Sequence, residues 1–491
     1  MTCKRTLHGR LLCAFGAFAI PCAMFLPGCG PAIKMTALIT MMPDQEDYFI
    51  EEVVPAFEKE HHARIQVVPY GTVDSLETYL RAYAATAGLV KVPFDRRTDL
   101  VEKGLIKPLG DLLSPQQRAA FKNEYLLTNL GEVNGRLCFI PRKFETRIMV
   151  YCKSRVAEAL GLWRKYKDEM NADLKRMNGG GLPADFYLEE DPSEWDYFDV
   201  FVVGWIWSHT QYDGRAVGRI GLRGKRYSGT WLGIVDRVFQ LGGDSSAVLS
   251  MTGDAVVDAF HWEAIYAASG VYNPEMWKKG WSGADIWRGF ARGEVFLSFM
   301  TQLDCFFLHG TGRDNIMGYF KNPDDMGVAL MPKASSAVLS GANMALRNGN
   351  RAITTGGWWW GIPASSPDPA GSYALASFIT STPQQIQECS RFGMVPVRKD
   401  VLSDMNMLFG GGWISRIYET SFKQLMQNGL TTLPMNPKLG AIGEVYLDAW
   451  YDIVANKNWS ADKLFPQRDY IRETLAAKYA VRAQRIFSGA E

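Results

Sequence analysis

The sequence lacks an excess of charge of either sign. Lys and Arg number 53 against 52 for Asp and Glu, which gives a formal net charge of +1. A protein that binds nucleic acid needs a basic surface to neutralise phosphates, and this chain has neither a basic excess nor an acidic tail. We therefore expect no nucleic-acid partner.

Motifs that bind nucleotides, activate a nucleophile or hold a metal are also missing. The chain contains no GxSxG, HExxH, GxGxxG or EF-hand pattern, and the nearest approach to a phosphate loop, residues 218–226, has the wrong spacing. The acidic pairs at 189–190 and 324–325 would serve a glycosidase only if two carboxyl groups faced one bond, and surface positions explain them better. We expect no catalytic residue, no cofactor and no metal site.

Cysteine is scarce and widely spaced. Three of the eight cysteines precede Cys29, and the four after it form no CxxC pair, which argues against metal clusters and redox motifs. We favour four single cysteines, and the alternative is one disulfide in an oxidising compartment. These four are Cys138, Cys152, Cys305 and Cys389.

The amino terminus has the composition of a secretory signal, with Lys4, Arg5 and Arg10 before an uncharged apolar run and small residues after it. Its end, Leu-Pro-Gly-Cys at 26–29, resembles a bacterial lipobox, although Pro27 stands where a small residue is usual. We expect residues 1–28 to form a lipoprotein signal peptide and Cys29 to carry lipid.

An uncleaved membrane anchor is the alternative, because residues 11–33 are 23 uncharged residues, enough to span a bilayer. Several Pro and Gly residues make such a span less favourable. Both alternatives place the mature chain outside the cytoplasm, either in the periplasm or at the cell surface.

The first part of the mature chain reads as strand, helix and strand over residues 35–42, 46–59 and 64–70. This βαβ pattern favours an α/β fold with a parallel sheet and ligand loops at the carboxyl ends of the strands. Asp44 falls in the first such loop, and the adjacent Asp95 and Arg96 follow another predicted strand, 89–93.

Residues 135–154 place a charged centre between two short apolar strands, 137–141 and 148–151. This is how a chain would look where it leaves one core and enters another. The alternative is a hairpin with a charged turn. Glu145 lies in that centre, with Arg142 and Arg147 on either side as its expected partners.

The chain carries 15 Trp, whose flat faces suit sugar rings but more often pack in a core. Trp231 lies in the first turn of a helix predicted at 229–241. In the extended run around 358–360, Trp358 and Trp360 share one face and Trp359 takes the other. Further segments are predicted as a buried aromatic run at 197–207, strands at 293–299, 326–331 and 392–397, and a helical tail at 439–486.

Five blocks occur in a fixed order: VVPAFEKE, DLVEKGLIKPLGDLL, NGRLCFIP with IMVYCKS, MGVALMPK, and GIPASSPDPAGSYALASFITSTPQQ with GMVPVRKDV. Together they resemble the family 1 extracellular solute-binding proteins of bacterial ABC importers, the group that includes maltose-binding proteins. The resemblance covers residues 35–480.

The resemblance implies a periplasmic-binding-protein-like fold, in which two α/β lobes are joined by a hinge of several crossings around a ligand cleft. It assigns 35–143 and 333–394 to the N-terminal lobe, and 148–330 and 398–491 to the C-terminal lobe. The crossings are expected at 135–154, at 330–333 and at 395–398.

The same resemblance places Asp44, Asp95, Arg96 and Glu145 where maltose-type binders hold sugar hydroxyls. Two departures stand out: Val92 replaces a stacking Trp, and a Thr-Gln-Leu loop containing Gln302 replaces Gly-Pro-Trp. An aromatic platform would have to come from elsewhere, and the candidates are Trp231, Trp281, Trp358 and Trp359.

The sequence thus predicts a lipid-anchored, monomeric receptor that is not an enzyme. It would bind a small hydroxyl-rich solute, a sugar or oligosaccharide, and deliver it to an ABC permease in the membrane. The alternatives are a lipid-anchored glycoside-processing enzyme and a surface interaction protein of the same fold.

Overall fold

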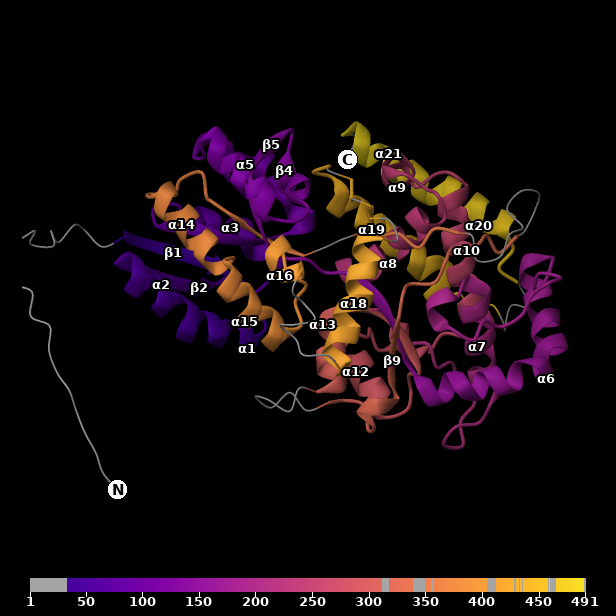
Figure 1. Ribbon diagram of the computed structural model, residues 1–491. Helices are drawn as coiled ribbons and strands as arrows, with labels where there is room; N and C mark the ends of the chain where they lie inside the picture. The colour runs from indigo at the N-terminus through magenta and orange to yellow at the C-terminus, as the bar shows by residue number, and fades with distance from the viewer. Residues whose placement is uncertain are drawn as a thin grey trace, which may run out of the picture.

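A computed structural model describes residues 33–310, 318–338, 349–354, 357–403, 412–427, 430–431, 433–434, 436–457, 459 and 465–489. The molecule is elongated, with two α/β lobes side by side (Figure 1). We call the lobe that contains the first strand the N-terminal lobe and the other the C-terminal lobe.

The N-terminal lobe is built on a five-stranded sheet with the order β2-β1-β3-β11-β6. Strands β1, β2 and β3 run parallel, and β11 lies antiparallel between β3 and β6. The strands are β1 (Ile33–Ile39), β2 (Ala63–Pro69), β3 (Ala87–Pro93), β6 (Phe139–Lys143) and β11 (Trp358–Gly361). The short strands β4 (Glu132–Val133) and β5 (Arg136–Leu137) form a separate pair.

Helices cover this sheet because its central strands are apolar on both faces, as in other parallel sheets; every residue of β3 is buried. They are α1 (Pro43–Tyr48), α2 (Val54–His61), α3 (Leu76–Ala82), α4 (Arg97–Glu102), α5 (Pro115–Glu124), α14 (Pro369–Ile379), α15 (Thr382–Phe392) and α16 (Lys399–Ser403). Helices α14 and α15 come late in the sequence and lie beside the first strands (orange against indigo in Figure 1).

The C-terminal lobe has a three-stranded antiparallel sheet of order β8-β7-β9, made of β7 (Arg147–Cys152), β8 (Leu297–Thr301) and β9 (Met326–Ala329). The short strands β10 (Ile353–Thr354) and β12 (Leu430–Thr431) pair with each other. Its helices are α6 (Lys153–Asn178), α7 (Tyr197–His209), α8 (Ser228–Gln240), α9 (Ser245–Ser250), α10 (Asp254–Ala268), α11 (Glu275–Lys278), α12 (Gly283–Ala291), α13 (Gln302–His309), α18 (Gly412–Met426), α19 (Leu439–Trp450), α20 (Arg468–Thr474) and α21 (Val481–Ser488).

The aromatic run at 197–207 is helix α7, which is buried along almost its whole length. Asp196 caps it: its carboxylate accepts from the amides of Phe198 and Asp199, and the Asp199 carboxylate accepts from the Asp196 amide. This reciprocal cap satisfies donors at the helix start. It explains why a segment with no polar face forms a helix.

The two strands on either side of Glu145 belong to different sheets, since β6 joins the five-stranded sheet and β7 the three-stranded one. Residues 143–147 therefore cross between the lobes, and the hairpin alternative is wrong. The two lobes that the resemblance implies are present. Strand β6 ends the first segment of the N-terminal lobe, and β7 begins the C-terminal lobe.

The second crossing lies later in the chain than residues 330–333. The Lys333 amide donates to the carbonyl of Trp195 over 2.8 Å, and the Thr354 amide donates to Asp236 over 2.7 Å. Both partners belong to the C-terminal lobe, so the chain stays there until Thr354 and enters the other sheet at Trp358. The expected boundary was wrong because the strand pattern of 326–331 does not reveal these long-range bonds.

The third crossing is also displaced. Residues 392–397 are not a strand: α15 ends at Phe392, and Gly393 follows with φ 65°, the left-handed conformation that favours glycine. Arg398 then pairs with Glu124 of α5 over 3.1 Å, which keeps α16 on the N-terminal lobe. The crossing falls between Ser403 and Gly412, and its course lies outside the described residues.

The helical tail is confirmed over its described part, by α19, α20 and α21. The four cysteines after Cys29 are all unpaired thiols. Within the residues that the structure describes, no helix combines the length and the apolar character needed to cross a membrane.

Candidate functional site

The predicted acidic residues meet at one edge of the five-stranded sheet. Strands β1 and β3 are parallel, and β11 is antiparallel to both β3 and β6, so β1, β3 and β6 end at the same edge. Asp44 follows β1, Asp95 follows β3 and Glu145 follows β6. This edge faces the C-terminal lobe, because the first crossing leaves from it.

Glu145 lies on the first crossing and keeps 27% of its side chain exposed. Its carboxylate pairs with Lys143 over 2.8 Å. The expected partners are engaged elsewhere, since Arg142 pairs with Glu388 and Arg147 with Asp236. Burial alone would raise the pKa of Glu145, but Lys143 and the more distant Lys91 and Arg223 lower it overall. Glu145 is therefore a charged acceptor whose side chain is partly exposed.

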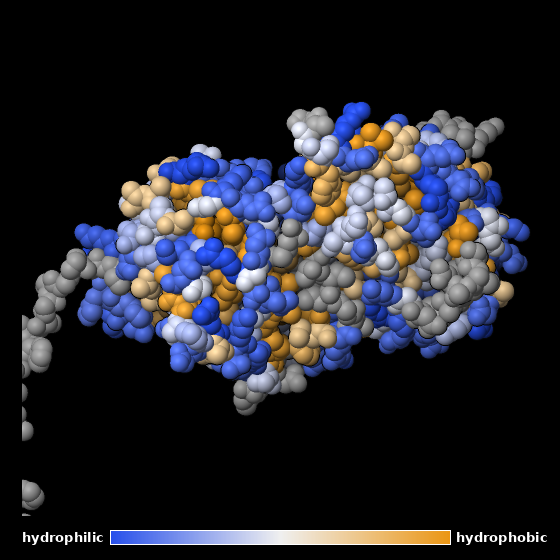
Figure 2. Space-filling view, turned by 90° about the horizontal axis from the view of Figure 1, so that it is seen from above, coloured by the Kyte–Doolittle hydropathy of each residue, from blue (hydrophilic) through white to orange (hydrophobic). Residues whose placement is uncertain are grey.

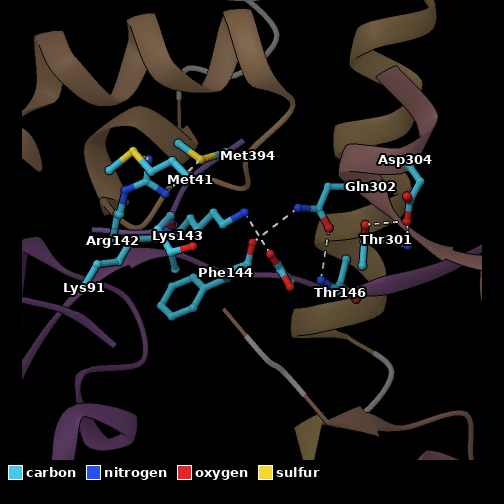
Figure 3. Close-up of polar contacts among 12 residues, drawn as sticks. Met41, Lys91, Arg142, Lys143, Phe144, Thr146, Thr301, Gln302, Asp304 and Met394 are labelled. Atoms are coloured by element: carbon cyan, nitrogen blue, oxygen red, sulfur yellow. Dashed lines mark hydrogen bonds and ion pairs between the residues drawn. The ribbon is translucent and has the colours of Figure 1, made fainter. Parts of the chain in front are cut away.

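Gln302 does not face the site but holds the crossing from the C-terminal lobe. It is fully buried at the start of α13, where its side-chain carbonyl accepts from the Thr146 amide over 3.1 Å and its amide donates to the Phe144 carbonyl over 3.3 Å (Figure 3). These two peptide groups lie on either side of Glu145. Gln302 thus positions Glu145, and its predicted role as a ligand contact has no support in this geometry.

A second glutamine holds the crossing from the N-terminal lobe. Gln385 of α15 is fully buried, donates to the Arg142 carbonyl over 3.3 Å and accepts from the Val397 amide over 2.9 Å. The segment 142–146 is consequently fixed at both ends by carboxamide bridges. Buried peptide groups need such partners, because an unpaired one costs free energy.

Lys91 of β3 and Trp358 of β11 lie on neighbouring strands near this edge of the sheet. The ammonium of Lys91 donates to the Thr40 carbonyl and lies 4.0 Å from the centre of the Trp358 ring. Burial lowers the pKa of Lys91 well below its usual range, and Arg142 and Lys143 lower it further. Trp358 is the one predicted tryptophan that is only half-buried here, and its face is taken by this cation.

Asp95 and Arg96 separate in the structure. Asp95 is half-buried at the end of β3, and burial raises the pKa of its carboxyl. Arg96 instead turns to Asp74, with which it forms an ion pair of 3.1 Å at the surface. Asp95 therefore stays near the sheet edge as a candidate, whereas Arg96 has a surface partner.

Asp44 is exposed and lines a small pocket between the lobes, with a volume of about 30 Å³. The pocket lies between α1 and the end of α15 on one side and α13 on the other. Its walls are largely apolar, as are parts of the surface between the lobes (Figure 2). The lining residues that the sequence did not single out are Met42, Leu303, Phe306, Phe307 and Phe392.

Three of the predicted tryptophans are core residues. Trp231 packs so closely on α19 that a Cβ on Gly443 would lie 2.5 Å from its ring, and Trp281 lies over Gly221 and Gly289. Trp359 has no exposed surface and carries the guanidinium of Arg97 4.6 Å from its ring centre. None of the three offers a face to a solute in this arrangement.

The sequence also missed the ion pair that borders the site from the C-terminal lobe. Arg223 pairs with Asp304 over 3.0 Å, and Asp304 also accepts from the Trp287 indole over 2.9 Å. Burial alone would lower the pKa of Arg223, but Asp304, Tyr227 and Glu145 raise it, which places Arg223 within electrostatic reach of Glu145. A Thr-x-x-Asp capping pattern at 301–304 was the available signal.

The described residues hold no group of three or more His, Cys, Asp or Glu side chains able to bind a metal ion. The junction between the lobes contains carboxylates after strand ends, an apolar pocket, and Lys and Arg side chains that already have partners. Such a set can accept hydrogen bonds from hydroxyls and cover apolar ring faces.

A family model described as "Bacterial extracellular solute-binding protein" matches residues 52–407. The chain belongs to this family. The match spans both lobes and the first two crossings, and it covers most of the chain. A search of curated protein sequences finds no match.

Solved structures of solute-binding proteins share the fold. Maltose-bound MalE3 of T. maritima is similar with a TM-score of 0.63 and 16% identity, covering 91% of this chain and 99% of that one. The GacH receptor of Streptomyces glaucescens gives 0.64 and 14%, covering 92% and 98%. A solute-binding protein of Thermotoga lettingae bound with α-D-tagatose gives 0.63 and 17%, covering 93% and 100%. The solute-binding family and these neighbours support the predicted two-lobed fold.

Proposed function

We propose that this protein is the extracytoplasmic solute-binding component of an ABC importer and that its solute is a neutral, hydroxyl-rich molecule, a sugar or short oligosaccharide. The observation that carries the proposal is the placement of Asp44, Asp95 and Glu145 at one sheet edge facing the other lobe. Carboxylates accept hydrogen bonds from several hydroxyls at once, and charged acceptors make the stronger bonds. Relatives of the same fold are described as bound to maltose and to tagatose.

Binding would couple to a hinge motion. Each lobe contributes groups to the junction, so a solute that contacts both lobes favours the arrangement in which they are close. The first crossing is held from both lobes, by Gln302 and by Gln385. A closed complex of this kind is the form that a membrane permease would recognise.

Isothermal titration calorimetry with a panel of neutral sugars tests the proposal. Saturable binding without turnover supports a receptor, and hydrolysis of any glycoside in the panel supports the glycoside-processing alternative instead. If no mono-, di- or oligosaccharide in the panel binds, the carbohydrate assignment is overturned and a surface interaction protein is favoured.

We further propose that Cys29 is lipidated and that the protein acts as a monomer held at the membrane by this lipid. Cys29 and the preceding residues lie outside the described residues, so the proposal rests on the lipobox pattern. Changing Cys29 to Ser should abolish incorporation of labelled fatty acid and leave either a precursor or a released protein. Mass spectrometry that finds residues 1–28 retained and Cys29 unmodified would contradict it.

A further inference from the structure

A second pocket lies within the C-terminal lobe, on the face of α8 that turns away from Trp231. It encloses about 60 Å³ and is bordered by α8, by Glu263 of α10 and by Met331 and Pro332, which follow β9. One probe sphere, about 10–15 Å³, is the least that a water needs, so the pocket has room for several non-hydrogen atoms. Its mouth is at Gly229 and Gly233, which are half-exposed and exposed.

Two residues that line this pocket carry hydrogen-bond donors without a partner. Among the described residues, the Arg237 Nη1 and the Gln240 Nε2 atoms have no hydrogen-bond partner, although both side chains are at least nine-tenths buried. Both residues line the pocket. A buried donor without an acceptor is costly, and an oxygen of a bound ligand would offset that cost.

The charges around the pocket are already balanced. Arg237 pairs with Glu263 over 3.0 Å, and Arg147 pairs with Asp236. Glu263 also accepts from the Tyr272 hydroxyl and from the Trp450 indole, each over 2.9 Å. An anion would upset these pairs, whereas a neutral acceptor such as a hydroxyl oxygen would satisfy the unused donors without adding charge.

The rest of the lining suits the carbon face of the same ligand. Ile234, Met276, Phe299 and Trp450 supply apolar wall beside the polar lining residues. A sugar has both features, since its ring carries apolar C–H faces and an edge of hydroxyls. Arg147, which stands two residues after Glu145 at the end of the first crossing, lines this pocket as well, so the pocket adjoins the site described above.

We propose that this pocket is a subsite that takes one hydroxylated end of the solute, with its oxygens accepting from Arg237 and Gln240. The inference rests on the proposed carbohydrate function and specifies where in the C-terminal lobe the solute is held. It also assigns these two residues to recognition of a neutral group.

Gly233 allows the pocket to be plugged without disturbing the fold. A Cβ built there would meet no atom within 4 Å, so a side chain would extend into open space. Gly161 of α6 is a matched control, because it is also an exposed helical glycine whose Cβ would meet nothing, and it does not line the pocket. Both Gly233→Leu and Gly161→Leu should fold, since glycine is a poor helix former.

Gln240→Glu provides a second, nearly isosteric variant. The Tyr197 hydroxyl donates to the side-chain carbonyl of Gln240, and a carboxylate would still accept that bond. The unused donor, however, would become an acceptor that repels a solute oxygen. A buried carboxylate costs free energy, so we expect a lower melting temperature, and binding is measured at a temperature where the variant is folded, where we expect the solute to bind more weakly.

The experiment is calorimetric titration of the wild type, Gly233→Leu, Gly161→Leu and Gln240→Glu with the same panel of neutral sugars. We expect one sugar to bind the wild type and Gly161→Leu equally, and Gly233→Leu and Gln240→Glu at least tenfold more weakly, as for loss of one good hydrogen bond. A crystal structure of the complex should show solute oxygens on Arg237 and Gln240.

Equal affinity of all four proteins for the sugar would overturn the subsite while leaving the proposed function intact. A complex that holds only water in the pocket would do the same. Failure of the folded wild type to bind any sugar would instead overturn the proposed function itself, and the subsite with it.

Discussion

The N-terminal lobe meets the junction with the ends of strands, whereas the C-terminal lobe meets it with the faces of helices. The strand ends are followed by acceptors, namely Asp44, Asp95 and Glu145. The C-terminal lobe carries donors, namely Arg223 in the loop before α8 and Arg237 and Gln240 on α8. A hydroxyl both donates and accepts, so a polyol between the lobes would satisfy both sides. Each lobe alone would therefore satisfy either the donor or the acceptor function of a solute hydroxyl, but not both.

The largest expected effect concerns the ion pair that anchors the ends of two crossings to the C-terminal lobe. Asp236 of α8 is 2% exposed in its side chain, pairs with Arg147 on the first crossing and accepts from the Thr354 amide and hydroxyl before the second crossing. Changing Asp236 to Ala would leave a buried guanidinium and a buried amide unpaired. We expect the free energy of unfolding to fall by about 3–5 kcal/mol, measured by urea denaturation.

Exposed pairs provide the control for this prediction. Asp285→Ala removes a surface partner of Arg288, although it also removes a helix cap, and should cost about 0.5–2 kcal/mol. A loss for Asp236→Ala no larger than that would show that the pair does not tie the crossings together.

The two glutamine bridges sharpen the comparison between lobes. Gln302→Ala and Gln385→Ala each leave two buried peptide groups without a partner, and each should reduce stability by about 2–4 kcal/mol. Only Gln302 bridges the peptide groups beside Glu145, so only Gln302→Ala should also weaken solute binding in calorimetry at a temperature where both variants are folded. Equal weakening by both would mean that Gln302 has no separate positioning role.

Glu145 tests the acceptor side directly. Glu145→Gln keeps the shape and removes the charge, and we expect the solute to bind ten- to a hundredfold more weakly, roughly 1.5–3 kcal/mol. The melting temperature without solute should change little, because the Gln carbonyl can still accept a hydrogen bond from the buried Lys143 ammonium. If the dissociation constant is unchanged, Glu145 pairs with Lys143 and does not contact the solute. Asp95→Asn and Asp44→Asn then test the other two carboxylates at this sheet edge.

The smallest effect is a pH dependence of the C-terminal lobe. His261 on α10 is fully buried, and burial lowers its pKa below 6.5, more than Asp258 and the bond with the Met177 carbonyl raise it, while Arg468 also lowers it. A lowered folded-state pKa means that the unfolded chain binds the proton more readily. Stability from this group is therefore complete above pH 6.5 and declines as the pH falls through the folded-state value.

His261→Gln should flatten that decline between pH 7 and pH 5, as followed by thermal melts. Stability curves of wild type and variant that stay parallel over this range would show that another group controls the acid sensitivity. The N-terminal lobe offers His61 as a comparison, because it is half-exposed at the end of α2.

Local patterns sufficed for β1, β3 and β6 and for the residues that follow them, whereas the strand predicted at 392–397 was wrong. The apolar runs of β1, β3 and β6 each end in a charged or polar group, so Asp44, Asp95 and Glu145 could be proposed from the sequence. Contacts between distant segments were invisible: nothing local shows that Lys333 bonds to Trp195 or that Arg398 pairs with Glu124. The second and third crossings were misplaced for that reason.

Tryptophans were poor guides to the site for a different reason. An aromatic ring looks the same in a sequence whether it packs on Gly443, as Trp231 does, or faces a solute. Gln302 lies beside the first crossing, as its segment was expected to. Its partners, however, are backbone groups, which a sequence pattern does not reveal. Arg237 and Gln240 were missed because polar residues on a helix usually indicate a solvated face.

The position of β11 has a consequence for how the protein is made. This strand completes the first sheet by lying between β3 and β6, but it is synthesised only after β7, β8 and β9 of the other lobe. During translation the facing edges of β3 and β6 would stay open while the whole middle of the chain emerges, and open strand edges invite pairing with other chains. The N-terminal lobe should therefore need protection of these edges until β11 is made, and the C-terminal lobe is completed later still, because α18 to α21 follow β11 in the sequence.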